Sequence, residues 1–236
     1  MNSLIESLKE KQSSYIPSES VSDHLRHVVM APIIGPVAVG KSTCMDKVVA
    51  LNPDEFGRVN SFTTRPVRPG EAETEYRFLT HDAATLQAIF KMAQNGGLVQ
   101  FAVHPTTGFI YGSDTTDYPK PYMMLDTLSG SVEALRQLPF KSVCEIALIM
   151  NPDTWTRCFT ARPMEHDERN KRLTEGVASL EWSLDQGNTI AWVINRSRRI
   201  RSTAETIAGL MTGTIEPSQN ERKTGIKLLN TIRELL

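Results

Sequence analysis

The stretch Gly35-Pro-Val-Ala-Val-Gly-Lys-Ser42 matches the phosphate-loop pattern G-x-x-x-x-G-K-[ST] at every fixed position. An apolar run at 28–34 precedes it and predicts a buried strand, and residues 44–51 can continue as a helix. Strand, glycine loop and helix in this order form the context in which the pattern binds nucleotide phosphates. A glycine-rich turn with a surface lysine is the competing interpretation, and the flanking segments make it the weaker one.

Each fixed residue of this loop has a chemical reason. Gly35 and Gly40 let the backbone take positive φ and approach an anion closely. Successive N–H groups then point into the loop, at the positive end of the following helix. We expect Lys41 to lie against the β- and γ-phosphates and the Ser42 hydroxyl to ligate Mg²⁺. The predicted phosphate-binding residues are Gly35, Val37, Ala38, Val39, Gly40, Lys41, Ser42 and Thr43.

The overall composition is that of an ordinary α/β protein. The 236 residues suffice for one large domain, with 40% hydrophobic and 22% charged residues. A net charge of −1 gives no reason to expect binding to nucleic acid or to anionic membranes. Three widely spaced cysteines, the absence of an apolar run near 18 residues and a start without a signal-peptide core predict a cytoplasmic protein.

A second informative stretch is Arg58-Val-Asn-Ser-Phe-Thr-Thr-Arg-Pro-Val-Arg-Pro-Gly-Glu71. It places Arg65 and Arg68 three residues apart, and Pro66 and Pro69 stiffen the backbone around them. Two guanidinium groups on such a loop make a preorganised clamp for a phosphate or a carboxylate. A solvated charged loop is the alternative on this pattern alone.

Within this stretch, Ser61 to Glu71, followed by Tyr76-Arg-Phe78, resembles the signature of guanylate kinases and guanylate-kinase-like domains. Looser similarities follow at 108–113, 123–126 and 193–195, so the resemblance covers roughly residues 27–212. It implies an α/β fold of the P-loop NTPase type: three α/β/α layers around a central parallel sheet, a small inserted subdomain for a nucleoside monophosphate, and a helical lid.

The resemblance also sets the expected domain boundaries. A guanylate-kinase-like domain would span 27–212, with its core at 27–59 and 113–212, the insert at 60–112 and the lid at about 154–185. Residues 1–26 read as a loosely packed helical or disordered extension. Residues 213–236 read as a linker and an amphipathic helix that packs on the domain or forms an oligomer contact.

By the same resemblance, the insert binds the acceptor nucleotide and the lid closes over the transferring phosphoryl group. The implied acceptor residues are Ser61, Arg65, Arg68, Glu71, Tyr76, Gln100, Tyr111, Gly112 and Ser113. The lid arginines expected to take part in catalysis with Lys41 are Arg157, Arg162, Arg169 and Arg172, and Asn195 falls where the family places a residue near the ATP base. An exposed basic helix pair is the alternative for the lid.

The strand Met123-Met-Leu-Asp126 ends in a carboxylate, and such a strand end commonly holds the Mg²⁺ shell in phosphate-loop enzymes. We therefore expect Mg²⁺ as cofactor, with Asp126 binding it in the second shell or through water. The family pattern has two aspartates here. Leu128 stands at the second position if no gap is placed, and a one-residue deletion would leave open which of the two Asp126 replaces. Gln100 stands where a glutamate reads the purine edge, and it offers one acceptor oxygen and two donors.

These observations predict a nucleoside monophosphate kinase that converts ATP and GMP to ADP and GDP, acting as a monomer or homodimer. Gln100 and Leu128 motivate one rival, a related kinase with another phosphorylated acceptor. The other rival is a non-catalytic module that holds phosphorylated protein segments in the arginine clamp. Lys41 and Ser42 oppose it, because a binding module has no need of an ATP site.

Overall fold

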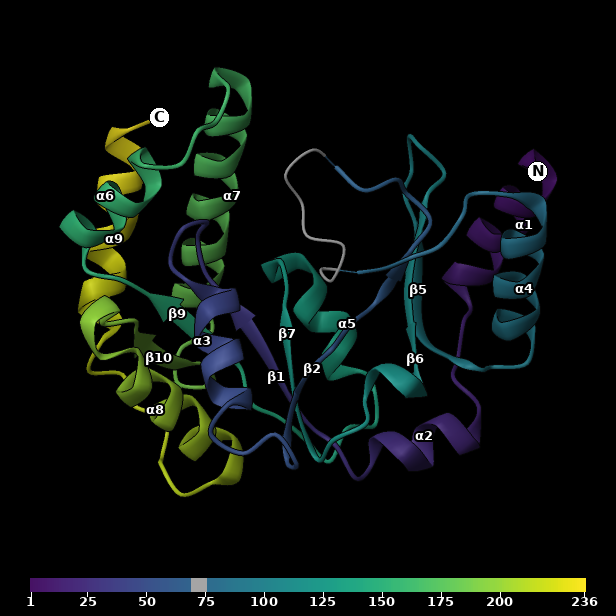
Figure 1. The fold of residues 1–236 in the computed structure, drawn as a ribbon, viewed down its shortest axis with the longest axis horizontal. Coiled ribbons are helices and arrows are strands. Elements are labelled where there is room, and N and C mark those ends of the chain that lie inside the picture. Colours follow the sequence, from purple (N-terminus) through teal and green to yellow (C-terminus); the bar gives the residue numbers. More distant parts are fainter. Residues whose placement is uncertain (69–75) are drawn as a thin grey trace. The chain divides into compact units, whose positions relative to one another are not determined.

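A computed structural model describes residues 1–68 and 76–236, which form two compact units (Figure 1). Unit 1 comprises Met1–Val28, Val59–Pro119 and Leu138–Lys141. Unit 2 comprises Val29–Arg58, Lys120–Gln137 and Ser142–Leu236. The chain therefore passes between the two units several times, and neither unit is a single continuous segment.

Unit 2 contains the parallel sheet that the sequence predicts. Its strands lie in the order β10 (Ala191–Ile194), β9 (Ile146–Ile149), β1 (Val29–Ile34), β7 (Tyr122–Asp126), β2 (Phe56–Arg58), and β8 (Ser142–Val143) pairs with β1. All six residues of β1 are buried, which explains the unbroken apolar run before the phosphate loop. The loop thus leaves the carboxyl end of a central strand.

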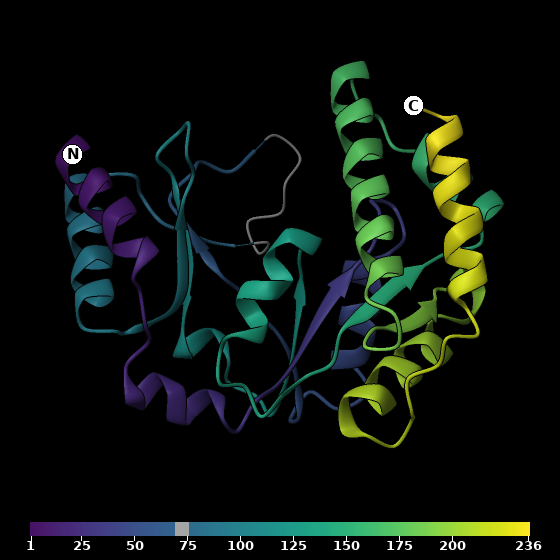
Figure 2. The same cartoon turned by 180° about the vertical axis from the view of Figure 1, so that it is seen from behind.

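Helices cover both faces of this sheet, as the α/β prediction requires. The helices of unit 2 are α3 (Lys41–Val49), α5 (Val132–Arg136), α6 (Pro152–Thr160), α7 (His166–Asp185), α8 (Ile200–Thr212) and α9 (Arg222–Glu234), with short 3₁₀ turns η2 (Ser129–Ser131) and η3 (Ser197–Arg199). Helix α3 packs against α8, and α7 packs against α9, which lies nearest the viewer in Figure 2. Leu228, Leu229 and Ile232 of α9 are buried in the core of unit 2.

Unit 1 is a mixed sheet covered by two helices. Its strands lie in the order β4 (Arg77–Phe78), β3 (Phe62–Thr63), β6 (Ile110–Asp114), β5 (Leu98–Val103). Its helices are α1 (Asn2–Ser13), α2 (Glu19–Leu25) and α4 (Ala83–Gln94), with the 3₁₀ turn η1 (Thr115–Asp117). Helices α1 and α4 lie side by side against the sheet in both ribbon views and share its core (Figures 1 and 2).

The N-terminal segment is part of the core of unit 1, so the expectation of a loosely packed or disordered extension is wrong. Leu8 of α1 is fully buried against the core that includes Leu86 and Phe101. The Tyr15 hydroxyl donates to the Leu98 carbonyl at 2.5 Å and accepts from the Leu98 N–H at 2.9 Å. The Gln12 side-chain oxygen accepts from the Val103 N–H at 2.8 Å. These bonds occupy backbone groups at both ends of the edge strand β5.

We expect Leu8→Ala to lower the free energy of unfolding by about 2–5 kcal/mol, because the truncation leaves a cavity in a closed core. The matched control is Ile16→Ala in the same segment, since the Ile16 side chain is 79% exposed and its loss should cost less than about 0.5 kcal/mol. Urea denaturation of both variants measures the difference. Equal effects would contradict a structural role for α1.

The compact units also differ from the predicted insert at its C-terminal end. Strand β6 pairs with β5 as far as Asp114, and the fully buried Tyr118 then packs on Phe140 with ring centroids 5.8 Å apart. Unit 1 therefore continues to Pro119, where the sequence analysis ends the insert at 112. Among the described residues, no helix combines the length and hydrophobicity needed to cross a membrane.

Candidate functional site

The loop at 35–42 has the backbone of a phosphate-binding turn. Ala38 and Gly40 both have left-handed conformations, with φ of 67° and 84°. Gly35 packs so closely on β9 that an added Cβ would collide with the Leu148 carbonyl oxygen. Helix α3 begins directly after Gly40, so its free N–H groups and its positive dipole end lie at the loop. The geometry is the one that the motif predicts for an anion site.

Ala38 is the only non-glycine residue with positive φ among those the structure describes. A residue with a Cβ loses about 1–2 kcal/mol of stability in the left-handed region, and a change to glycine removes this cost. The same change makes the unfolded chain more flexible, which lowers the stability by about 0.4–1 kcal/mol. We therefore expect Ala38→Gly to raise the free energy of unfolding by about 0.5–1 kcal/mol in urea denaturation. Ala50→Gly, at a right-handed helix end with φ of −67°, should destabilise instead. A loss of stability at both positions would contradict strain at Ala38.

Two side chains hold the loop from its outer side. The Trp155 indole N–H of α6 donates to the Val37 carbonyl at 2.8 Å, and the Asn195 side-chain amide donates to the Val39 carbonyl at 2.9 Å. Both side chains are buried. The sequence alone assigns no role to Trp155, since no pattern of spacing predicts its bond to the loop. The predicted position of Asn195 near the ATP base stays a prediction, and in the structure its amide is bonded to the phosphate loop.

Lys41 lies over the loop. Its ammonium group donates to the Gly35 carbonyl at 2.6 Å and lies 3.6 Å from the Asp126 carboxylate. Strand pairing places these groups together, since Asp126 is the register partner of Ile33 at the end of β1. Although 41% of the Asp126 side chain is exposed, the protein atoms that crowd its carboxylate raise its pKa, and Lys41 opposes this.

The donor set at this edge of the sheet fits Mg²⁺. Ser42, in the first turn of α3, supplies a hydroxyl, and Asp126 supplies a carboxylate, and hard oxygen donors of this kind suit the ion. One or two protein donors are what Mg²⁺ takes when nucleotide phosphates and water complete its shell. The described residues contain no cluster of three or more carboxylate, imidazole or thiol groups that would favour another metal.

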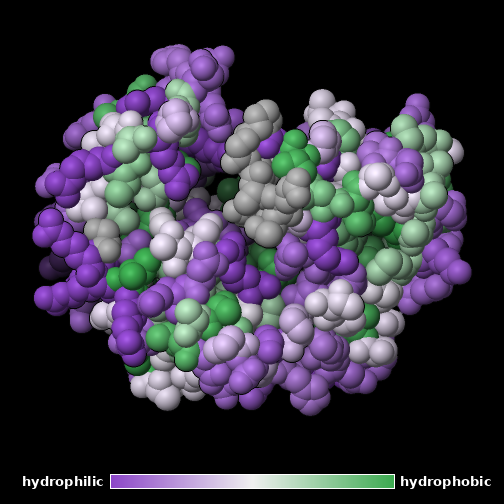
Figure 3. All heavy atoms as spheres, viewed as in Figure 1, coloured by the Kyte–Doolittle hydropathy of each residue, from purple (hydrophilic) through white to green (hydrophobic). Residues whose placement is uncertain are grey.

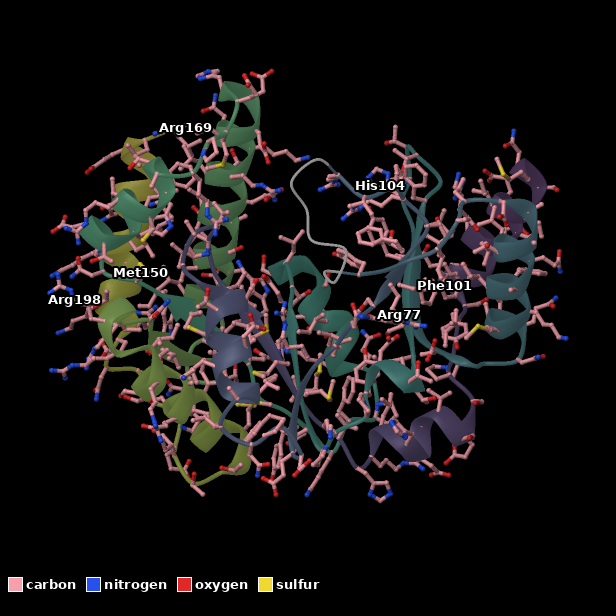
Figure 4. All side chains as sticks on the ribbon, viewed as in Figure 1. Arg77, Phe101, His104, Met150, Arg169 and Arg198 are labelled. Carbon is pink, nitrogen blue, oxygen red and sulfur yellow. The ribbon has the colours of Figure 1, made fainter. Side chains whose placement is uncertain are left out.

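The lid arginines lie on and between α6 and α7, as predicted. Arg157 and Arg162 are exposed, and the Arg169 guanidinium lies 5.2 Å from the centre of the Phe159 ring (Figure 4). Arg172 is paired with Glu175 at 3.0 Å and with Glu168 at 3.6 Å. Arg172 therefore has to leave these carboxylates before it can neutralise a phosphate.

The basic run at 196–201 is partly neutralised within unit 2. Arg196 pairs with Glu221 at 3.4 Å, and Arg201 pairs with Glu205 at 2.9 Å. Arg198 is exposed (Figure 4), and hydrophilic side chains gather along this edge of the unit in Figure 3. The run has the character of a solvated face.

The predicted acceptor residues that the structure describes all belong to unit 1. Arg65 is only 5% exposed, and its guanidinium lies 5.2 Å from the centre of the Tyr76 ring and 5.3 Å from that of Phe78. Tyr76 in turn contacts Tyr111 edge to face, with centroids 6.1 Å apart. Stacking on aromatic rings restrains the guanidinium in one orientation, which is what a phosphate clamp requires.

The strands of unit 1 set the rest of this face. Phe101 and Val103 belong to the core of unit 1, so alternation places Gln100 and Ala102 on the opposite face, beside their partners Ser113 and Tyr111. Ser113 is fully buried, and its hydroxyl is bonded to that of Tyr118 at 3.1 Å. Gly112 lies under Phe62, where a Cβ would come within 2.5 Å of the ring. Gly112 and Ser113 thus serve the packing of the sheet.

Three further acceptor predictions stand as follows. Ser61 is half-buried beside β3, and its carbonyl accepts from the Arg77 N–H at 3.0 Å. Arg68 is exposed. Glu71 lies outside the described residues, so its predicted role in holding the clamp stays a prediction.

Arg77 is a half-buried residue of unit 1 to which the sequence alone assigns no role. Its guanidinium binds Asp114 at 2.8 Å and Asp117 at 2.9 Å (Figure 4). Asp114 and Asp117 also cap the turn η1. The network therefore fixes the end of β6 that follows Tyr111.

Two of the three cysteines have thiols that are desolvated by burial and do not act as nucleophiles. All three are free, and burial raises the pKa of the Cys44 thiol to about 12 and that of Cys144 to about 11. These two thiols are therefore protonated at neutral pH, which excludes them from thiolate chemistry. The chemistry of the site rests on phosphate-binding groups.

A comparison with protein families finds a match for part of this chain. Residues 26–116 match the family model described as guanylate kinase. Over this segment the chain resembles guanylate kinases. The segment includes the phosphate loop and the Arg65 and Arg68 stretch, so the resemblance is confirmed where its motifs are most specific. The matched segment ends before Asp126, the lid and Asn195, and the roles of all the predicted site residues stay predictions.

A solved structure is also similar to this chain. It is the crystal structure of guanylate kinase from Anaplasma phagocytophilum, at 19% sequence identity and a TM-score of 0.44. The similarity covers 79% of this chain and 85% of that one.

Proposed function

We propose that the protein transfers a phosphoryl group from ATP to a nucleoside monophosphate, with GMP as the favoured acceptor. The observation that carries this proposal is the position of Lys41, whose ammonium lies over a left-handed phosphate loop and beside the carboxylate of Asp126. A binding module that only holds phosphorylated segments has no use for this arrangement. The match of residues 26–116 to the guanylate kinase family supports the same reaction.

The residues that would bind ATP, those of the phosphate loop and Asp126, would act by positioning the phosphates and neutralising their charge. The N–H groups of the loop would bind the β- and γ-phosphates, and Lys41 would exchange its bond with the Gly35 carbonyl for contacts with phosphate oxygens. Ser42, with Asp126 through water, would hold Mg²⁺, which neutralises phosphate charge when bound. An acceptor phosphate is already ionised at pH 7, so the residues need not supply a base.

The acceptor half would be the aromatic-backed arginine clamp of unit 1. Arg65 and Arg68 would neutralise the dianionic phosphate, while the hydroxyls of Tyr76 and Tyr111 add directed donors without adding charge. Arg157, Arg162, Arg169 and Arg172 would close over the transferred group from the lid. Closure would require Arg172 to leave Glu168 and Glu175.

Gln100 is the residue that bears on selectivity for the acceptor base. Gln100 lies on the same face of the sheet as Tyr111, so it is placed to meet an acceptor base there. Its amide cannot accept both donors of the guanine edge, and an unmatched buried donor costs about 1–3 kcal/mol. We therefore expect weaker discrimination between GMP and other nucleotides than a glutamate would give.

A coupled assay of ADP release tests the proposal. With ATP and Mg²⁺ present, GMP, dGMP, AMP, pyrimidine nucleotides and ribose phosphates are offered in turn as acceptors. The proposal expects transfer to at least one nucleoside monophosphate and the highest rate with GMP. Transfer only to a phosphorylated sugar would favour the rival kinase, and no binding of Mg·ATP would favour the phosphopeptide-binding module.

A further inference from the structure

We propose that Trp155 and Asn195 are positioning residues that set the phosphate loop in its binding shape before any nucleotide arrives. The inference rests on the proposed function, because it assigns how the ATP phosphates are received. Neither residue needs to touch the reacting atoms for this role. Each acts through one peptide group of the loop.

The geometry of the peptide bond carries the first step. In a trans peptide the carbonyl and the following N–H point in opposite directions, and the described residues contain no cis peptide. Trp155 holds the Val37 carbonyl, so the Ala38 N–H points away from Trp155. Asn195 holds the Val39 carbonyl, so the Gly40 N–H points away from Asn195. Two alternate N–H groups of the loop are thereby fixed by side chains outside it.

Both supports are themselves rigid. The Trp155 side chain is fully buried and stacks on Phe159, with centroids 4.9 Å apart and planes 15° from parallel. Asn195 is 4% exposed, and its own N–H donates to the Ile149 carbonyl at the end of β9 at 2.7 Å. An anchor that does not move loses little entropy on bonding, so these bonds preorganise the loop efficiently.

Gly40 shows how closely Asn195 approaches the loop. A Cβ at Gly40 would come within 2.5 Å of the Asn195 side-chain nitrogen. The second glycine of the motif therefore has two reasons in this chain: its left-handed φ of 84° and the space that the Asn195 amide occupies. Gly40 leaves the space in which the Asn195 amide bonds to the loop, so the two residues depend on each other.

Trp155 also joins the loop to the lid. The ring of Phe159 lies between the Trp155 indole and the Arg169 guanidinium, which is 5.2 Å from the ring centre. The stack thus reaches the Val37 carbonyl through the edge of the Trp155 indole and a lid arginine through the ring of Phe159. A substitution of Trp155 should therefore alter both the phosphate loop at Val37 and the position of Arg169.

The test compares ATP with inorganic tripolyphosphate, which has the phosphates and no base. Calorimetry with Mg²⁺ measures both ligands on wild type, Asn195→Ala and Trp155→Phe. We expect each variant to bind both ligands about tenfold more weakly, as the loss of one buried hydrogen bond predicts, with the KM for the acceptor unchanged. Trp192→Phe is the matched control: Trp192 is a buried indole of the same unit whose N–H has no hydrogen-bond partner among the described residues. It should bind both ligands as wild type does.

The possible results separate the inference from the proposed function. Unchanged affinities in both variants would overturn the inference, and so would a loss for ATP alone in Asn195→Ala, which would mark a contact with the base. A wild-type protein that binds ATP but no tripolyphosphate would also overturn it, since a preformed loop holds phosphates without a base. A wild-type protein that binds neither ligand would overturn the proposed function itself. Because the two variants alter different anchors, loss of folding in one leaves the other to decide.

Discussion

Lys41→Met should lower kcat by about 10²–10³-fold, because it removes a preorganised charge from the transferring phosphoryl group. The side chain is nearly isosteric along its stem, so the fold of α3 should persist. The same substitution removes the ammonium that lies 2.6 Å from the Gly35 carbonyl and 3.6 Å from the Asp126 carboxylate. Steady-state kinetics with saturating ATP and the best acceptor measure the effect.

Lys47→Met is the control for Lys41→Met, since it makes the same change in the last turn of the same helix. It should retain activity within about twofold, as expected for a substitution away from the loop. A Lys41→Met protein that keeps more than about a tenth of the wild-type kcat would contradict the assignment of Lys41 to the transferring group.

Arg65→Met should lower kcat/KM for the acceptor by about 10²-fold, while the KM for ATP changes little. A charge-assisted, forked contact with a phosphate is worth about 1.5–3 kcal/mol, and Arg65 is held for such a contact by the rings of Tyr76 and Phe78. Initial rates at varied acceptor and fixed ATP, then the reverse, separate the two parameters.

The control for Arg65→Met is Arg26→Met, an exposed arginine of unit 1 that pairs with Glu19 and Asp23. It should leave both kinetic parameters unchanged. If Arg65→Met raised the KM for ATP as much as that for the acceptor, Arg65 would belong to the donor side and the clamp would be wrongly assigned.

The phosphate loop and its flanking elements could be predicted from the sequence because each position has one dominant local cause. The buried run before Gly35 can only be a central strand, and Gly40 is at a left-handed position. The periodicities of α4 and α9 and the alternation of β5 are similarly local signals. The pairing of Lys41 with Asp126 depends on the strand order, in which β7 lies beside β1, and the structure supplies that order.

The rest depends on contacts between distant segments, which no local pattern contains. Leu8 lies in a polar, serine-rich start that reads as an extension, and only the α4 and β5 surfaces give it a core. Trp155 reads as one more aromatic on an amphipathic helix until its indole N–H is seen on the Val37 carbonyl. Ser113 looks like a ligand by its place after Tyr111, yet its hydroxyl is turned to the buried Tyr118.

The hydrogen bonds of Gln12 and Tyr15 to β5 affect when the N-terminal segment can fold during synthesis. Tyr15 and Leu98 are 83 residues apart, and at about 5–20 residues per second the ribosome needs several seconds to supply that partner. Unit 1 closes later still, when the Lys141 N–H reaches the Leu25 and Val28 carbonyls. Helix α1 thus cannot be buried until α4 and β5 have been made, and during synthesis its apolar stripe is a surface that a nascent-chain chaperone would meet.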